Sequence, residues 1–102
     1  MRKINAFIDL LKETIECAEI ERNHIDKGVP SDWNYGLLKN VVFPEINELL
    51  SYANKGEIYF KYGKKQRRLE STYFLLDSFK RLSETPLGEK ILELQHFYDS
   101  IS

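Results

Sequence analysis

Apolar residues recur in alternating steps of four and three along the first quarter of the chain. At about 100° per residue, such steps keep side chains on one face of an α-helix. The stripe, in which one position is an arginine, consists of Ile4, Ile8, Leu11, Ile15, Ala18, Arg22 and Ile25, with Phe7 beside it. Gly28 and Pro30 follow the stripe, and both residue types are common where helices end. The pattern therefore predicts an amphipathic helix over residues 4–26.

A second apolar stripe continues across a proline. Its members are Tyr35, Leu38, Val42, Ile46, Leu49 and Ala53. They share one helical face although Pro44 lies among them, and a proline bends a helix that continues through it. Ser31 or Asp32 could cap the start of this helix, and the sequence Asn54-Lys55-Gly56 marks its end. We expect one helix over residues 32–54, kinked at Pro44.

Residues 57–82 admit two interpretations. Read as strands, the sequences EIYFKY and RLESTYFLL would flank a turn at residues 63–65, which the β-propensity of isoleucine, tyrosine and phenylalanine allows. Read as a helix, the segment carries a stripe formed by Tyr59, Tyr62, Gln66, Leu69, Tyr73 and Leu76. An isolated hairpin is only marginally stable in water. Because the stripe passes Gly63 without a phase break, we favour a helix over residues 57–82.

The last segment has the clearest start signal in the chain. Thr85 is a good N-cap residue, and Pro86 follows it at the first helical position. Apolar residues then recur in steps of three and four at Leu87, Ile91, Leu94, Tyr98 and Ile101. A helix over residues 86–101 is therefore predicted. Four amphipathic helices joined by short links predict an all-α, antiparallel up-and-down bundle that forms a single domain over residues 1–102.

Composition and charge narrow the class of protein. The chain is 42% hydrophobic and 30% charged, as in a globular domain, and its formal net charge of −1 attracts no polyanion as a whole. Cys17 is the only cysteine, which excludes an intramolecular disulfide and suits a reducing compartment. The apolar runs are far shorter than the ~20 residues of a membrane span. These features predict a soluble cytoplasmic protein, and no motif implies a cofactor.

An acidic surface is expected on the first helix, opposite its apolar stripe. Asp9, Glu13 and Glu16 surround Ile20 on this face. Carboxylates can steer a basic partner, and an exposed apolar residue can contribute affinity. The alternative is an ordinary solvated helix face with one isolated isoleucine. We favour a small adaptor or inhibitor that binds another protein, such as a toxin-neutralising protein of the bacterial immunity type; the aromatic excess of the chain also allows a homodimer.

A basic segment gives the alternative interpretation. Its cations are Lys61, Lys64, Lys65, Arg67 and Arg68, interleaved with tyrosine and phenylalanine. Such a segment could bind nucleic acid or another anionic surface if rings and cations shared one exposed face. In a helix over 57–82, however, the cations lie opposite most of the rings, as on any amphipathic helix. Nucleic acid is therefore the less favoured partner.

Paired Glu-x-x-His spacings suggest a remote third possibility. Glu21 precedes His24 by three residues, and Glu93 precedes His96 in the same way. Di-metal carboxylate bundles use such pairs on two inward-facing helices. Both pairs are expected to point away from the apolar stripes of their helices, so we predict no metal site. The sequence also lacks a glycine-rich phosphate loop and a nucleophile motif, which favours a protein that is not an enzyme.

Overall fold

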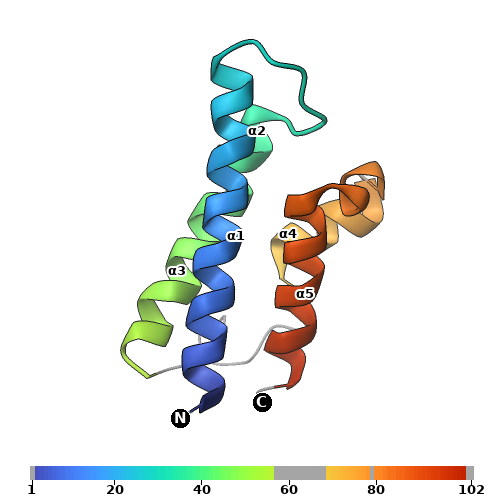
Figure 1. The fold of residues 1–102 in the computed structure, drawn as a ribbon. Coiled ribbons are helices and arrows are strands. Elements are labelled where there is room, and N and C mark those ends of the chain that lie inside the picture. The colour runs from blue at the N-terminus through green and yellow to red at the C-terminus, as the bar shows by residue number, and fades with distance from the viewer. Residues whose placement is uncertain (1, 57–68, 79, 101–102) are drawn as a thin grey trace.

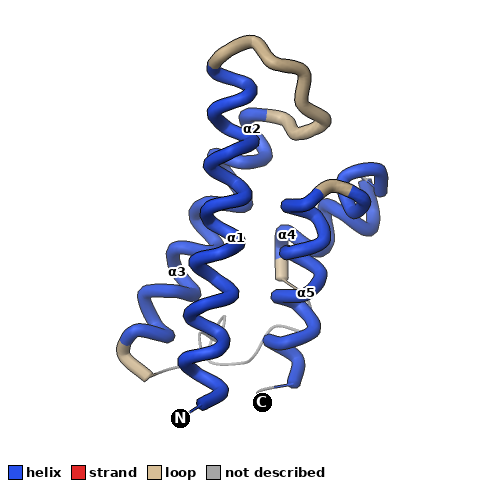
Figure 2. The backbone as a smooth tube through the Cα atoms, in the orientation of Figure 1, coloured by secondary structure: helices blue, strands red, loops and turns tan. Residues whose placement is uncertain are grey.

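The structure, a computed structural model, describes residues 2–56, 69–78 and 80–100. It is a helical bundle, and no strand occurs within these ranges (Figures 1 and 2). The elements are α1 (Arg2–Asp26), α2 (Tyr35–Leu37), the π-helical turn η1 (Leu38–Val42), α3 (Phe43–Asn54), α4 (Glu70–Tyr73), the π-helical turn η2 (Phe74–Ser78), the 3₁₀ helix η3 (Lys80–Glu84) and α5 (Pro86–Ser100). The predicted all-α class is confirmed. Within the described ranges, none of these helices combines the length and apolar character needed to cross a bilayer.

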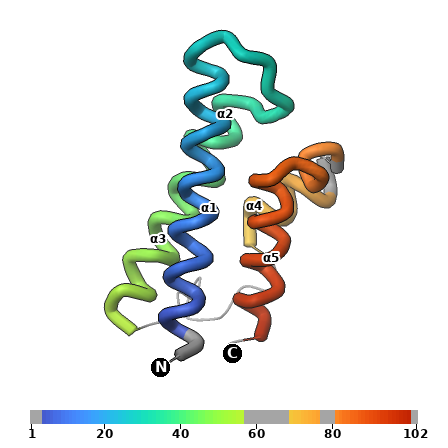
Figure 3. Tube along the Cα trace, in the orientation of Figure 1, coloured from blue at the N-terminus to red at the C-terminus, as the bar shows by residue number. Residues whose placement is uncertain are grey.

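The central helix is α1, which lies between α3 and α5 and contacts both (Figures 1 and 3). Its buried side chains are Phe7, Leu10, Leu11, Thr14 and Ala18. The buried face is therefore rotated from the predicted stripe, and Ile4, Ile8 and Ile15 are only half-buried. Because α1 is covered from two sides, a polar residue also falls inside. The Thr14 hydroxyl is satisfied by donating to the Leu10 carbonyl (2.7 Å).

The second helix begins later than predicted. Its cap is Asn34, whose side-chain oxygen accepts hydrogen bonds from the backbone N–H groups of Gly36 (2.7 Å) and Leu37 (3.2 Å). Ser31 does not cap it, because its hydroxyl donates to Glu21 (2.5 Å) and accepts from the Trp33 N–H (3.1 Å). The helical backbone then runs through α2, η1 and α3 to Asn54.

Pro44 is accommodated by the π turn. In an α-helix the ring of Pro44 would clash with the carbonyl of Asn40, four residues earlier. The turn before it is widened instead, and the Phe43 N–H donates to the Leu38 carbonyl, five residues back. A π turn contains one more residue than an α turn, which gives the proline ring room. A kink was predicted at Pro44, and the structure has the π turn η1 directly before the turn that contains this proline.

The predicted helix over residues 57–82 is wrong in its extent. Residues 57–68 lie outside the described ranges, but Leu69 is extended, with φ −68° and ψ 148°, and helical structure begins at Glu70. Side chains from two other helices hold this start. Gln95 accepts a hydrogen bond from the Leu69 N–H (2.6 Å), and Glu45 accepts from the N–H groups of Glu70 (2.7 Å) and Ser71 (2.9 Å).

The predicted start of the last helix is confirmed. Pro86 is the first residue of α5, and the Thr85 hydroxyl accepts a hydrogen bond from the Gly88 N–H (3.1 Å). Gly88 lies against the backbone of the preceding segment, so close that a Cβ atom there would be 1.8 Å from the Leu82 carbonyl oxygen. The absence of a side chain therefore allows α5 to begin directly beside η3.

Candidate functional site

The acidic face of α1, defined as Asp9, Glu13, Glu16 and Ile20, is exposed along its whole length. Ile20 is 53% exposed, the highest value for a large hydrophobic residue in the part of the chain that the structure describes. Asp9 and Glu16 take part in no ion pair with the residues that the structure describes. The structure thus places the four side chains where the sequence predicted them, on the solvent side of α1.

One edge of this face is neutralised by α5. The Lys90 ammonium lies 2.7 Å from a Glu13 carboxylate oxygen and 3.7 Å from Glu93. The hydrogen bond from Lys90 to Glu13 raises the pKa of the lysine. Glu13 therefore links α1 to α5, and the carboxylates that remain for a partner are chiefly Asp9 and Glu16. The sequence could not show this pairing, because the two residues are 77 positions apart.

Cys17 lies between this edge and the core and is half-buried. Burial raises the pKa of its thiol, and the carboxylates of Glu13, Glu16 and Glu21 act in the same direction, while Lys90 opposes them. A thiol whose pKa is raised stays protonated at neutral pH and is a poor nucleophile. The geometry around Cys17 therefore favours packing rather than covalent chemistry.

The two Glu-x-x-His pairs have different surroundings. Glu21 is half-buried and accepts the Ser31 hydrogen bond, because the buried face of α1 is rotated toward it. The prediction that Glu21 points outward is therefore wrong. His24 is half-buried, whereas Glu93 and His96 are exposed on α5. Within the described ranges, no three histidine, cysteine or acidic side chains gather where they could hold a metal ion.

The five cations of the basic segment, Lys61, Lys64, Lys65, Arg67 and Arg68, lie outside the described residues. The structure therefore adds nothing to the interpretation of residues 61–68 as an anion-binding segment.

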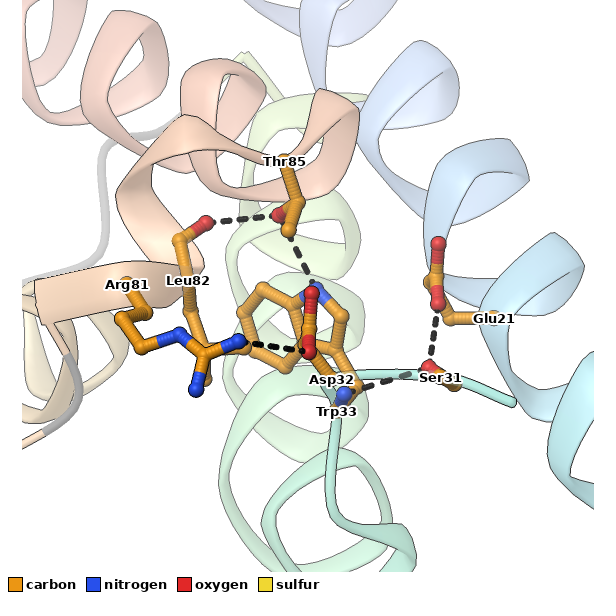
Figure 4. Close-up of polar contacts among 7 residues, drawn as sticks. All are labelled: Glu21, Ser31, Asp32, Trp33, Arg81, Leu82 and Thr85. Carbon is orange, nitrogen blue, oxygen red and sulfur yellow. Dashed lines mark hydrogen bonds and ion pairs between the residues drawn. The ribbon is translucent and has the colours of Figure 1, made fainter.

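A polar cluster joins the loop after α1 to the start of α5 (Figure 4). The indole N–H of Trp33, which is 4% exposed, donates to the Thr85 hydroxyl (3.0 Å), and that hydroxyl donates to the Leu82 carbonyl (2.6 Å). Asp32 and Arg81 form an exposed pair at 3.5 Å beside it. The cluster contains no nucleophile–base pair, so its evident role is to fix the loop against α5.

A pocket of about 280 Å³ opens between α1 and the helix formed by α2, η1 and α3. It is lined by Ile15, Glu19, Arg22, Tyr35, Leu38, Lys39, Phe43 and Asn47. The Arg22 guanidinium lies over the Phe43 ring, 5.0 Å from its centroid, which is a cation–π contact. In the part of the chain that the structure describes, neither Arg22 nor Lys39 forms a hydrogen bond or an ion pair with a carboxylate.

The sequence prediction missed this pocket, although one signal for it was present. Arg22 occupies a position in the first apolar stripe, where a cation needs a partner. That partner is Phe43, a residue of another helix that lies outside the second stripe. The signal indicated an unusual position, but only the packing of α1 against α3 shows what surrounds it.

Comparisons of the chain with protein-family models, with curated proteins and with solved structures find no match.

Proposed function

We propose that this chain is a small protein-binding module, an adaptor or inhibitor, that engages a basic protein surface through the acidic face of α1. The observation that carries the proposal is Ile20, an aliphatic side chain that is 53% exposed among carboxylates. Desolvation of an apolar residue at the centre of an interface contributes affinity, and surrounding charges steer the encounter. Asp9 and Glu16 supply those charges.

The most specific form of the proposal is a toxin-neutralising protein of the immunity type, acting in the cytoplasm. A helix that presents carboxylates around one apolar residue is suited to cover a cationic surface and to block its access to an anionic substrate. In this form the module works by occlusion and needs no catalytic group of its own.

Site-specific crosslinking can test the proposal. A photoreactive residue placed at position 20 should capture a partner protein with a basic contact surface from the native source. The same residue at Glu48, an exposed position on α3, is the matched control and should not capture it. Capture from both positions, or from position 48 alone, would contradict the assignment of the interface to α1.

Once a partner has been captured, substitutions on the acidic face measure how much this face contributes to binding it. Ile20→Asp should weaken binding by about tenfold or more, because it puts a charge at the centre of the interface. Asp9→Lys combined with Glu16→Lys should slow association and reduce its dependence on salt, whereas Glu48→Lys should not. A Glu48→Lys effect about half as large as that of the double reversal, in proportion to the change in net charge, would show that only net charge matters.

A further inference from the structure

We propose that the pocket between α1 and α3 is a binding site for a small aromatic carboxylic acid. The pocket is separate from the acidic face. On α1, the face formed by the lining residues Ile15, Glu19 and Arg22 is centred roughly 110° around the helix axis from the face formed by Asp9, Glu16 and Ile20, at about 100° per residue. The two proposals can therefore succeed or fail independently.

The size and floor of the pocket suit a ligand with one or two rings. Its volume of about 280 Å³ is near the lower end of the range for small-molecule sites, which is roughly 300–1,000 Å³. Ile15 and Phe43, both half-buried, provide apolar surface, and Leu38 lies completely buried beneath it. At the rim, the Tyr35 ring is 45% exposed and is available to stack against an aromatic ligand.

The charge of the pocket favours an acid. Arg22 and Lys39 contribute two cations and Glu19 contributes one anion, so the lining carries a net charge of +1 on a chain whose net charge is −1. The Arg22 guanidinium is held 5.0 Å from the centroid of the Phe43 ring, and its N–H groups can donate to a planar carboxylate. Lys39 has no carboxylate partner among the described residues and can complete the site.

Local backbone geometry supports the same location. Leu38 and Lys39 belong to the π turn η1, and π turns are frequent at functional sites. Asn47, one turn of α3 beyond Phe43, adds an amide that can donate to a carboxylate or accept from a ring N–H. Thus the pocket combines an apolar floor, two cations and one adaptable polar group.

A matched pair of probes tests the proposal directly. The isotope-labelled full chain is titrated with indole-3-acetate and, separately, with its neutral analogue indole-3-acetamide, and amide shifts are followed by NMR. The acid should shift the signals of Arg22, Tyr35, Lys39 and Phe43 and should bind about tenfold more tightly than the amide. Equal affinities, or no shifts at these residues up to millimolar concentrations, would overturn the proposal.

Charge-removing substitutions in the pocket should change its affinity for an acid and its affinity for a cation in opposite directions. Lys39→Gln should weaken binding of the acid about three- to tenfold, and Glu19→Gln should tighten it, because it removes the one carboxylate of the lining. Arg22→Gln should weaken it further, with circular dichroism verifying that this variant is folded. Arg81→Gln, which removes an exposed arginine elsewhere, should change nothing. Weaker binding in Glu19→Gln would contradict the charge argument.

A last experiment distinguishes a free small acid from the C-terminal carboxylate of a polypeptide as the ligand. An acetylated tripeptide ending in tryptophan offers the same ring, with the carboxylate one carbon farther from it, and two further residues. Because a volume of about 280 Å³ suits one or two rings, the two further residues have no place in the pocket, and this peptide should be a weaker ligand than indole-3-acetate. A peptide that binds more tightly than the free acid would overturn the assignment to a small molecule.

Discussion

Gly88 shows how one residue can be required by close packing alone. Its backbone dihedrals are helical, so left-handed geometry does not demand glycine here. The demand comes from the Leu82 carbonyl oxygen, 1.8 Å from where a Cβ atom would lie, with the Leu82 carbonyl carbon at 2.7 Å. Both atoms belong to the backbone and cannot rotate away as a side chain can.

Gly88→Ala should therefore be strongly destabilising. Relief of the clash requires that α5 move away from η3, and overpacking of this kind costs about 1–3 kcal/mol or more. For a domain of this size, each kcal/mol lowers the melting temperature by about 4–8 °C. Thermal unfolding followed by circular dichroism measures the loss. Glu89→Ala, at the exposed neighbouring position, is the control and should leave the melting temperature nearly unchanged.

Glu45 predicts a particular dependence of stability on pH. Burial raises the pKa of its carboxyl above the ordinary value of 4.5, although hydrogen bonds from Ser71 and Glu70 act in the opposite direction. The folded state therefore holds this proton more tightly than the unfolded state does. The resulting contribution to stability is complete below pH 4.5 and is lost as the pH rises through the raised pKa of the folded state.

Urea unfolding of the wild type and of Glu45→Gln across pH 4–8 measures this contribution. The free energy of unfolding of the wild type, taken relative to the variant, should fall as the pH rises above 4.5. Glu48→Gln provides the reference profile for removal of one exposed carboxylate from the same helix. A relative stability that instead rises with pH would mean that the two amide donors outweigh burial and lower the pKa of Glu45.

At the scale of elements, Thr85 connects three segments through one hydroxyl. It caps α5 by accepting from the Gly88 N–H. It also donates to the Leu82 carbonyl within η3 and accepts from the Trp33 indole in the loop after α1 (Figure 4). The segments around Trp33 and Thr85 are 52 residues apart in sequence. This hydroxyl therefore fixes the loop and the start of α5 together.

Thr85→Val should destabilise the protein by about 1–3 kcal/mol, because it removes the helix cap and leaves the buried indole N–H without its acceptor. Thr85→Ser keeps the hydroxyl and should recover most of this loss. Chemical denaturation of both variants makes the comparison. If the serine and valine variants were equally destabilised, the methyl group rather than the hydroxyl would be responsible.

For the whole molecule, one connected core predicts one unfolding transition. The buried residues of α1, α3, η2, η3 and α5 form a single cluster, which includes Trp33. Since Trp33 is the only tryptophan, its fluorescence reports the loop and the start of α5, whereas circular dichroism reports all helices. The two denaturation curves should coincide, as in a two-state domain. Fluorescence that changes at a lower denaturant concentration would show that the loop end unfolds separately.

The sequence by itself determined the features that depend on neighbouring residues along the chain. The helical class, the end of α1 near Gly28 and the start of α5 at Thr85 and Pro86 follow from periodicity and capping, whose partners lie within one turn. The exposure of Asp9, Glu13, Glu16 and Ile20 follows in the same way. The helix ends are set by contacts within one turn, and the exposure of this face is predicted by its polar side chains.

Only the tertiary structure decided the features that depend on distant partners. The buried face of α1 includes Leu10 and Thr14 because α3 and α5 cover that helix from two sides. Helical structure restarts at Glu70 because Glu45 and Gln95, which are 25 and 26 residues away from the amides that they accept, satisfy the backbone at this point. The pocket likewise exists only where Arg22 of α1 meets Phe43 of α3. Hydrophobic periodicity predicts which residues prefer burial, but it does not predict which helix covers them.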